Sequence, residues 1–183
     1  MMKRFLFLSM IILCFNSNAQ NQFGAGINIG VRNTGLELQY YFLNRIKIYG
    51  GASLSRYSSF SNRIGICLFL LPNDKQHNFG LTNSIEYKYG KTTILEKEDV
   101  FYSYNTNALN YLNFGGVYTF KIYFDDSKKN AFLFEVELFW KQLLNQLIIT
   151  ENNNQQESIQ LQNSIERYYK SGLGLSIGMK LIF

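Results

Sequence analysis

The last twelve residues, 172–183, read GLGLSIGMKLIF. Large apolar side chains stand at every second position from Leu173 onward, and small or polar residues fill the positions between them, except at Ile182. Successive side chains of a β-strand point to opposite faces, so this period of two predicts a strand with one apolar face. The strand is expected to reach an aromatic residue, Phe183.

The same alternation recurs along the chain. The stretches QFGAGINIGV (22–31), LELQYYF (36–42) and AFLFEVELFWK (131–141) each place most of their large apolar residues at alternate positions. A helix would scatter such residues around its circumference, whereas a strand gathers them on one face. Eight strands are expected, near residues 22–31, 35–43, 45–57, 62–71, 77–90, 108–124, 130–147 and 167–183.

The predicted connections alternate in length. Residues 43–45, 72–76 and 125–129 form tight turns, whereas residues 91–107 and 148–166 form longer polar loops. The other two connections on the loop side, near 32–34 and 56–61, are shorter. An even number of antiparallel strands places both termini at the turn end, and short turns opposite longer loops are typical of bacterial outer-membrane barrels. We therefore predict an all-β fold with one domain, residues 20–183, that forms an eight-stranded antiparallel up-and-down transmembrane barrel.

The first twenty residues read MMKRFLFLSMIILCFNSNAQ, with a basic start, an apolar run and a small-residue exit. This three-part pattern predicts a secretory signal peptide, residues 1–19, and the apolar run is too short for a membrane-spanning helix. Cleavage after Ala19 removes 19 of the 183 residues and leaves 164. The alternative is lipid attachment at Cys14, although Leu13 before it is too bulky for that processing.

The composition argues against several classes of function. Removing Lys3 and Arg4 from the 18 basic residues leaves 16 against 13 acidic ones, without a basic stripe, so nucleic acid is not an expected partner. Cys67 is the one cysteine after the leader, so neither a disulfide nor a thiolate metal site is expected. The single histidine, His77, lies in a predicted turn, where a solvated polar role is expected. No motif predicts a catalytic, metal or cofactor site, and no cofactor is expected.

Alternation alone does not say which face of the barrel is apolar. A soluble lipocalin-like barrel would hide its apolar face inside, around an apolar ligand. The polar positions here are rich in Gly, Ser, Thr and Asn, which suits a narrow lumen better than a solvated surface. Aromatic residues also gather where two membrane interfaces would fall. This predicted aromatic girdle comprises Phe42, Phe79, Phe124 and Phe132 at the turn end and Tyr87, Tyr89, Tyr111, Trp140 and Tyr169 at the loop end.

A terminal aromatic behind alternating apolar residues resembles the C-terminal signature of the small porin-like outer-membrane barrels. The resemblance covers the last strand and, more loosely, residues 22–183. It implies insertion in the bacterial outer membrane, contact with its lipid and lipopolysaccharide, and recognition by the barrel-assembly machinery during biogenesis. The implied assembly signal consists of Leu175, Ile177, Met179, Leu181 and Phe183.

An eight-stranded barrel is wide enough only for its own side chains. Basic residues on the lipid side would cost about 2–4 kcal/mol each at mid-depth, so charges are expected inside, where they can pair. The expected lumen ion network comprises Glu37, Glu86, Glu135, Glu137, Lys47, Lys88, Lys121, Lys141 and Lys180. Hairpin geometry predicts that Glu135 lies opposite Thr119 and between Lys121 and Lys180. Glycines of the first and last strands are expected to leave one wall nearly bare.

These observations predict a non-enzymatic membrane protein with a filled lumen and a structural, adhesive or envelope-assembly role. Loops 91–107 and 148–166 are the expected contact sites for a surface or envelope partner. Three alternatives stay open: a narrow passive channel, a lipid A-modifying barrel enzyme, and a secreted lipocalin-like barrel. The biological process, the identity of a partner and the oligomeric state are not readable from the residues.

Overall fold

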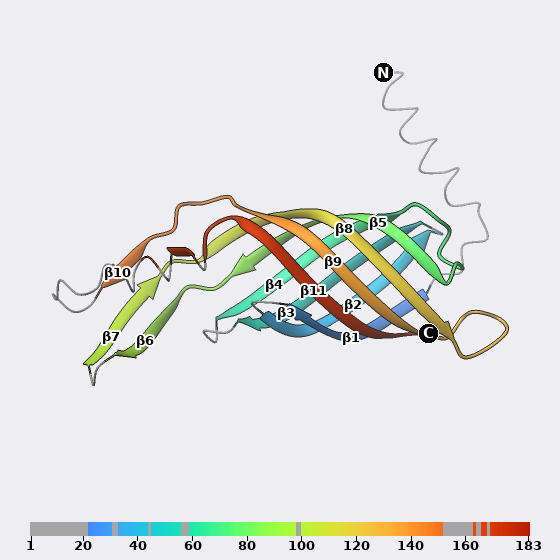
Figure 1. Cartoon of the computed structure of the whole chain (residues 1–183), viewed down its shortest axis with the longest axis horizontal. Coiled ribbons are helices and arrows are strands. Elements are labelled where there is room, and N and C mark those ends of the chain that lie inside the picture. Colours follow the sequence, from blue (N-terminus) through green and yellow to red (C-terminus); the bar gives the residue numbers. More distant parts are fainter. Residues whose placement is uncertain are drawn as a thin grey trace, which may run out of the picture.

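The computed structural model describes residues 22–30, 33–43, 45–55, 59–97, 100–151, 163, 166–167 and 169–183. Eight strands close into an antiparallel barrel in the order β1-β11-β9-β8-β5-β4-β3-β2, which confirms the predicted fold class (Figure 1). The strands are β1 (Gln22–Gly30), β2 (Asn33–Leu43), β3 (Ile46–Ser55), β4 (Phe60–Phe69), β5 (His77–Lys88), β8 (Leu109–Tyr123), β9 (Ala131–Leu143) and β11 (Gly172–Ile182). The predicted leader and Cys14 lie outside the described residues.

The first and last strands close the barrel. β1 pairs with β11 from Gly24 opposite Ile182 to Gly30 opposite Ser176. Beyond this ladder, Phe23 and Phe183 exchange two backbone hydrogen bonds of 2.9 Å each. Their rings also lie 5.6 Å apart on the outer face. The closure leaves neither of these strands with a free edge, which would otherwise invite association with other chains.

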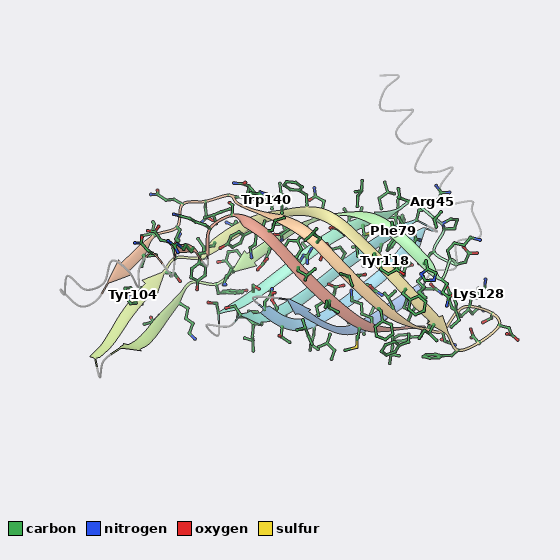
Figure 2. All side chains as sticks on the ribbon, viewed as in Figure 1. Arg45, Phe79, Tyr104, Tyr118, Lys128 and Trp140 are labelled. Atoms are coloured by element: carbon green, nitrogen blue, oxygen red, sulfur yellow. The ribbon has the colours of Figure 1, made fainter. Side chains whose placement is uncertain are left out.

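The alternation seen in the sequence separates the two faces of the barrel wall. In β11, Leu175, Ile177 and Met179 are exposed on the outer face, whereas Ser176 and Lys180 are buried in the lumen. The same division holds along the other strands and covers the outer face with apolar side chains (Figure 2). This arrangement is the reverse of a soluble barrel. Among the described residues, no helix is long and apolar enough to cross a membrane.

A folded connection fills the turn end of the barrel. Residues 70–76 join β4 to β5, and Asn78 holds them through its side chain, which accepts from Leu71 N at 3.0 Å and donates to Leu71 O at 2.8 Å. Asn73 is buried and donates to Gln22 Oε1 at 2.7 Å. Gln22 in turn donates to Lys128 O at 2.9 Å, in the next connection. Two connections therefore form a floor beneath the lumen.

At the loop end the structure corrects one expectation. Residues 91–107 are not an irregular loop but contain the hairpin of β6 (Lys91–Lys97) and β7 (Val100–Thr106), to which β10 (Ile149–Glu151) adds a third strand. The sheet order β10-β7-β6 repeats the order of β9, β8 and β5, so the sheet extends one side of the barrel wall beyond the rim (Figure 1). Residues 152–162 of the second predicted loop lie outside the described residues.

Two asparagines hold the bend between the barrel and this extension. Asn145 donates to Ala108 O at 2.8 Å and accepts from Asn110 N at 2.7 Å. Asn107 donates to Gln146 O at 2.9 Å and accepts from the backbone N of residue 148 at 2.8 Å. Side-chain amides thus satisfy backbone groups that the interrupted ladder leaves unpaired.

Candidate functional site

The centre of the lumen holds a chain of buried charges. Lys180 Nζ donates to Glu37 Oε1 and, at 2.9 Å, to Glu135 Oε1. The second oxygen of Glu135 lies 2.5 Å from Lys47 Nζ. Asn28 closes the chain by donating to Glu37 Oε2 at 2.5 Å. We call these five residues the central network; they come from β1, β2, β3, β9 and β11.

The strand register explains why these groups meet. Glu135 lies opposite Thr119 on β8, as predicted, and opposite Gly178 on β11. Lys180 is two residues further along β11, on the same face, so its ammonium reaches the carboxylate. Gly26 faces Lys180, and a Cβ added there would lie 2.6 Å from Lys180 Cγ. The bare wall of β1 therefore provides the room that the lysine side chain fills.

The predicted contact between Glu135 and Lys121 is wrong. Lys121 Nζ instead donates to Asn73 O at 2.5 Å and to the side-chain oxygen of Asn73. Lys121 lies closer to the turn end than Glu135, where the connection 70–76 enters the lumen. Lys47 on β3 occupies the place beside Glu135 that the prediction gave to Lys121. The error concerns the partner and not the register.

A second cluster lies on the loop side of the central network. Arg63 forms a two-pronged ion pair with Glu137, with N···O distances of 2.8 and 2.6 Å. Thr82 donates to the same carboxylate at 2.8 Å, and Arg63 also donates to Ser84 Oγ at 2.7 Å and to Tyr49 OH at 3.0 Å. We call this the arginine cluster. Such planar pairing fixes both groups more firmly than a single contact.

The sequence prediction omitted Arg63. The signal was present, because Ile64, Ile66 and Leu68 of the same strand face outward and therefore place Arg63 and Cys67 inside. The nine charges that were predicted all lie on the inner face. Glu86 pairs with Lys141 at 2.8 Å. Lys88 Nζ lies 4.5 Å from the centre of the Tyr169 ring.

An aromatic and aliphatic layer separates the central network from the floor of the barrel. Tyr41 stacks on Phe69 with ring centres 6.0 Å apart, and the Lys121 ammonium lies 4.8 Å from the Tyr41 ring. The layer comprises Tyr41, Cys67, Phe69, Ala131, Leu133 and Ile182. The same apolar cluster continues to Tyr49, which contacts Arg63, and to Val117, which stands opposite Glu137. Cations over aromatic faces are stabilised by the ring quadrupole. The layer therefore separates the central network from the turn end, and its aromatic rings still accommodate the ammonium group of Lys121.

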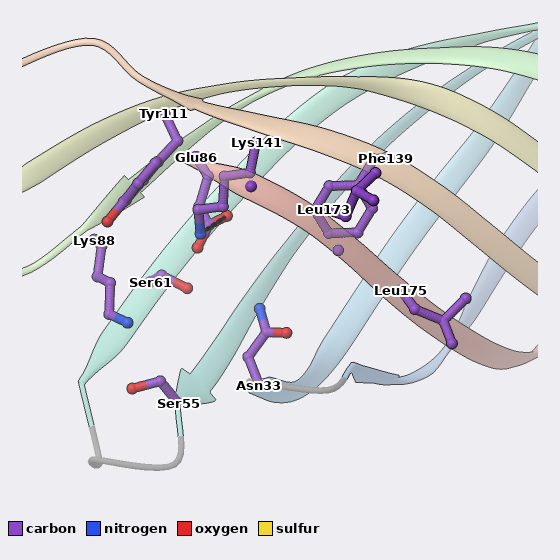
Figure 3. A pocket seen from close by; sticks show the side chains of 12 residues that line it. Asn33, Ser55, Ser61, Glu86, Lys88, Tyr111, Phe139, Lys141, Leu173 and Leu175 are labelled. Atoms are coloured by element: carbon purple, nitrogen blue, oxygen red, sulfur yellow. Dashed lines mark hydrogen bonds and ion pairs between the residues drawn. The ribbon is translucent and has the colours of Figure 1, made fainter. Parts of the chain in front are cut away.

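The lumen contains two small cavities, one toward the loop end and one lined by Arg63 of the arginine cluster and by Glu37 and Asn28 of the central network. Their volumes are about 50 and 40 Å³, and both are lined by Asn33, Glu86 and Phe139. Figure 3 shows the first of the two. Spaces of this size hold a few water molecules. Phe139 fills the lumen because Gly174 stands opposite it; a Cβ on Gly174 would lie 2.4 Å from the ring. These cavities are too small for a substrate of the size of a sugar or an acyl chain.

The predicted aromatic girdle is partly wrong. Phe79, Tyr87, Tyr89, Phe124 and Trp140 are exposed on the outer face, and Phe42 and Phe132 are half-buried. Phe79 and Trp140 lie toward opposite ends of the barrel (Figure 2).

Tyr111 and Tyr169 do not belong to the girdle, because they are only 1% and 3% exposed. Tyr111 shares its parity with the inward Asn113, and its hydroxyl donates to Tyr169 O at 2.8 Å. Tyr169 lies across the mouth, where its hydroxyl is 3.1 Å from Ser59 Oγ. With Tyr104 and other apolar residues they form a cap at the loop end.

Further aromatic residues, which the sequence analysis did not include in the girdle, complete the outer rings. Tyr118 packs against Phe79 at 5.0 Å at the turn end, and Phe60 packs against Tyr89 at 5.5 Å at the loop end. His77 is exposed at the turn end, where its Nδ1 lies 2.6 Å from Tyr118 OH. This histidine contacts aromatic rings and is far in sequence and height from the loop-end cavity.

Comparison with known proteins finds a likeness among solved structures. No protein-family model matches this chain, and no curated protein matches it either. Among solved structures, the crystal structure of the N-terminal β-barrel domain of OprF from Pseudomonas aeruginosa matches with a TM-score of 0.58 and 10% sequence identity, over 91% of this chain and 100% of that domain. The chain thus shares the β-barrel fold of this domain, and its own barrel is closed by eight strands.

Proposed function

We propose that this chain is a small integral barrel of the bacterial outer membrane, with a lumen closed by its own side chains and a non-enzymatic role in the structure or surface contacts of the envelope. The observation that carries the proposal is the distribution of the two kinds of side chain. The outer face is apolar between two aromatic rings, and the charged side chains lie inside in pairs.

The apolar outer face supports membrane insertion over the soluble alternative. Leu36, Leu81 and Leu173 are each at least 65% exposed, and they belong to a surface that continues around all eight strands. Soluble monomers rarely expose connected apolar patches larger than a few hundred Å². A lipocalin-like barrel would also need an apolar interior for its ligand, but the lumen here contains the central network and the arginine cluster.

The layered lumen supports a closed barrel over a channel. The cap, the arginine cluster, the central network, the apolar layer and the floor follow one another along the axis. The cavity of about 50 Å³ lies toward the loop end, and the cavity of about 40 Å³ is enclosed where the arginine cluster meets the central network. An eight-stranded barrel has little cross-section beyond its side chains.

The loop end supports a contact role. The sheet of β6, β7 and β10 projects beyond the rim, where it is accessible to molecules outside the barrel (Figure 1). Asn107 and Asn145 hold its base rigidly against the barrel. A rigid platform is a better contact surface than an unordered loop, because less conformational entropy is lost on binding. We place the surface or envelope partner on this sheet and lipopolysaccharide around the loop-end aromatic ring.

The decisive experiment is membrane fractionation of cells that express the full chain, followed by electrophoresis of heated and unheated samples. We expect the protein in the outer-membrane fraction, with a mobility that changes on heating because the closed barrel unfolds only then. Recovery of the folded protein in the soluble extract without detergent would refute the proposal.

Two further measurements test the two membrane alternatives, a passive channel and a lipid A-modifying enzyme. Purified protein in planar bilayers is expected to show no stepwise conductance above the protein-free background; steps would favour the channel. Lipid A from cells with and without the protein is expected to have the same acylation pattern. A change that His77→Ala abolishes would instead indicate an enzyme.

The last strand is the proposed signal for the assembly machinery. Phe183→Ala is expected to reduce the folded, heat-shifted form in cells, because the terminal aromatic is lost. Phe60→Ala, which removes an exposed aromatic elsewhere, serves as the control. Equal yields of the two variants would contradict the proposed signal.

A further inference from the structure

One polar side chain interrupts the middle of the apolar outer face. Asn83 of β5 is exposed, with Phe79 four residues before it and Tyr87 four residues after it on the same face. It therefore lies midway between the two aromatic rings. Other outward polar residues of the barrel strands stand near the ends of the strands: Thr34, Asn62, Asn110 and Gln142 toward the loop end, and His77 at the turn end.

The amide of Asn83 has no hydrogen-bond partner among the described residues. This contrasts with Asn62, whose amide donates to Tyr89 OH at 3.2 Å within the loop-end aromatic ring. An amide in hydrocarbon without a partner is costly, and acyl chains cannot supply one. Polar residues at mid-depth usually mark a contact with another polar group. We therefore expect the amide of Asn83 to contact a polar group of another molecule within the membrane.

The surface beside Asn83 is shaped for packing. A groove of about 440 Å³ lies along its β4 side, lined by Ile46, Ile66, Leu68, Leu81, Thr82 and Asn83 itself. On the β8 side, Gly116 stands opposite Leu81, and a Cβ added there would meet nothing closer than 3.8 Å. Leu81, which is 65% exposed, is therefore a ridge between two hollows.

We propose that this patch is the interface of a parallel homodimer, in which Asn83 pairs with Asn83 of a second copy. The inference rests on the proposed membrane location. Two copies inserted in the same direction hold Asn83 at the same depth, so a two-fold axis along the membrane normal brings the two amides together. An amide both donates and accepts, so the pair is self-complementary in charge. The ridge and the hollows are equally present on both copies, as an isologous contact requires.

Hydrogen bonding favours a second copy of the chain over lipid at this patch. An acyl chain would fill the groove but leave the amide unpaired. A second asparagine satisfies it, as buried asparagine pairs do at coiled-coil interfaces. Gly116 has no side chain, so the backbones of two copies can approach closely there. Such close approach stabilises contacts within a membrane.

The test uses two single-cysteine variants of the full chain in a background in which Cys14 and Cys67 are both replaced by serine. Asn83→Cys places a thiol on the proposed interface, and Ile27→Cys places one at the middle of β1, four strands away around the barrel. Ile27 and Asn83 are both exposed on the outer face, so both thiols are accessible. Oxidation in isolated membranes is expected to yield at least ten times more covalent dimer from Asn83→Cys.

A second measurement avoids cysteine. Donor- and acceptor-labelled chains are mixed in phosphatidylcholine vesicles over a range of protein-to-lipid ratios, and energy transfer reports association. Asn83→Leu is expected to raise the apparent dissociation constant at least tenfold, whereas Asn83→Gln, which retains an amide, stays closer to the unchanged protein.

Several results would overturn the dimer. These are equal cross-linking of the two cysteine variants, monomers at every protein-to-lipid ratio, and cross-linking of Asn83→Cys to a different envelope protein in place of itself. Heat-shifted mobility establishes that each variant is folded. A folded, membrane-inserted monomer refutes the dimer alone, whereas a soluble protein refutes the membrane proposal.

Discussion

Replacing Glu135 by glutamine should destabilise the barrel strongly. The carboxylate is buried and lies 2.5 Å from the Lys47 ammonium and 2.9 Å from the Lys180 ammonium. Removing one partner of a buried ion pair costs about 3–5 kcal/mol, because the remaining charge stays in a region of low dielectric constant. Lys180 retains Glu37, so the loss falls mainly on Lys47 and we expect the lower value, about 3 kcal/mol.

Urea unfolding in detergent micelles measures this loss. Trp140 is the single tryptophan and is exposed on the outer face, so unfolding moves it from detergent to water and shifts its fluorescence. With a urea dependence of about 2 kcal/mol per molar, the midpoint should fall by about 1.5 M.

The matched control is Asp126→Asn, which removes an exposed carboxylate in the connection 124–130 and should change the free energy of unfolding by less than about 0.5 kcal/mol. The double variant Lys47→Met with Glu135→Leu should recover most of the lost stability, because apolar replacement of a whole buried pair is often neutral. A loss below about 1 kcal/mol for Glu135→Gln would refute the reasoning, since it would mean that water already solvates the central network.

Three further outcomes are expected. Gly174→Ala should cost about 1–3 kcal/mol because its Cβ would meet the Phe139 ring, whereas Gly172→Ala, with open space around it, should be tolerated; equal heat-shift midpoints would contradict this. Ile177→Arg should cost about 2–4 kcal/mol in vesicle refolding, because the charge enters the lipid at mid-depth, and a neutral result would argue against insertion. Slight desolvation raises the pKa of Asp125, but hydrogen bonds from its own turn outweigh this effect and lower the pKa below the ordinary value of 3.8. The ionised carboxylate therefore stabilises the turn above pH 3.8, and this stabilisation is lost as the pH falls below that value. Amide exchange of the turn should accelerate at the lower pH, and Asp125→Asn should remove this pH dependence.

The strand order, the closure and the inward or outward direction of most side chains could be predicted because a strand has only two faces. Once Ile177 faces outward, Lys180 must face the lumen, three positions away. Arg63 obeys the same rule and was predictable. The identity of ion-pair partners was not, because alternation fixes the face of a residue but not its height in the barrel. Lys121 meets Asn73 because of how the connection 70–76 folds, and no periodicity describes a connection.

The loop end shows a second limit of the sequence. Residues 91–107 contain β-branched and aromatic residues, but they also contain charged and polar ones, so no sustained period of two reveals these strands in the sequence. Tyr111 shows the opposite difficulty. Its residue type favoured a membrane interface, whereas its parity with Asn113 favoured the lumen, and the structure follows parity. Where residue preference and strand geometry disagree in a barrel wall, geometry has the larger effect, since turning one side chain outward requires a bulge.

The separation of the lumen into layers has a consequence for any attempt to open it. The arginine cluster and the central network share no ion pair among the described residues. Eliminating both charges of the Arg63–Glu137 pair would enlarge the cavity that Arg63 and Glu37 line, but Lys180, Glu135 and the apolar layer would still lie across the path. Conductance should therefore require changes in both layers, and a single-layer variant that conducts ions would show that the apolar layer admits water.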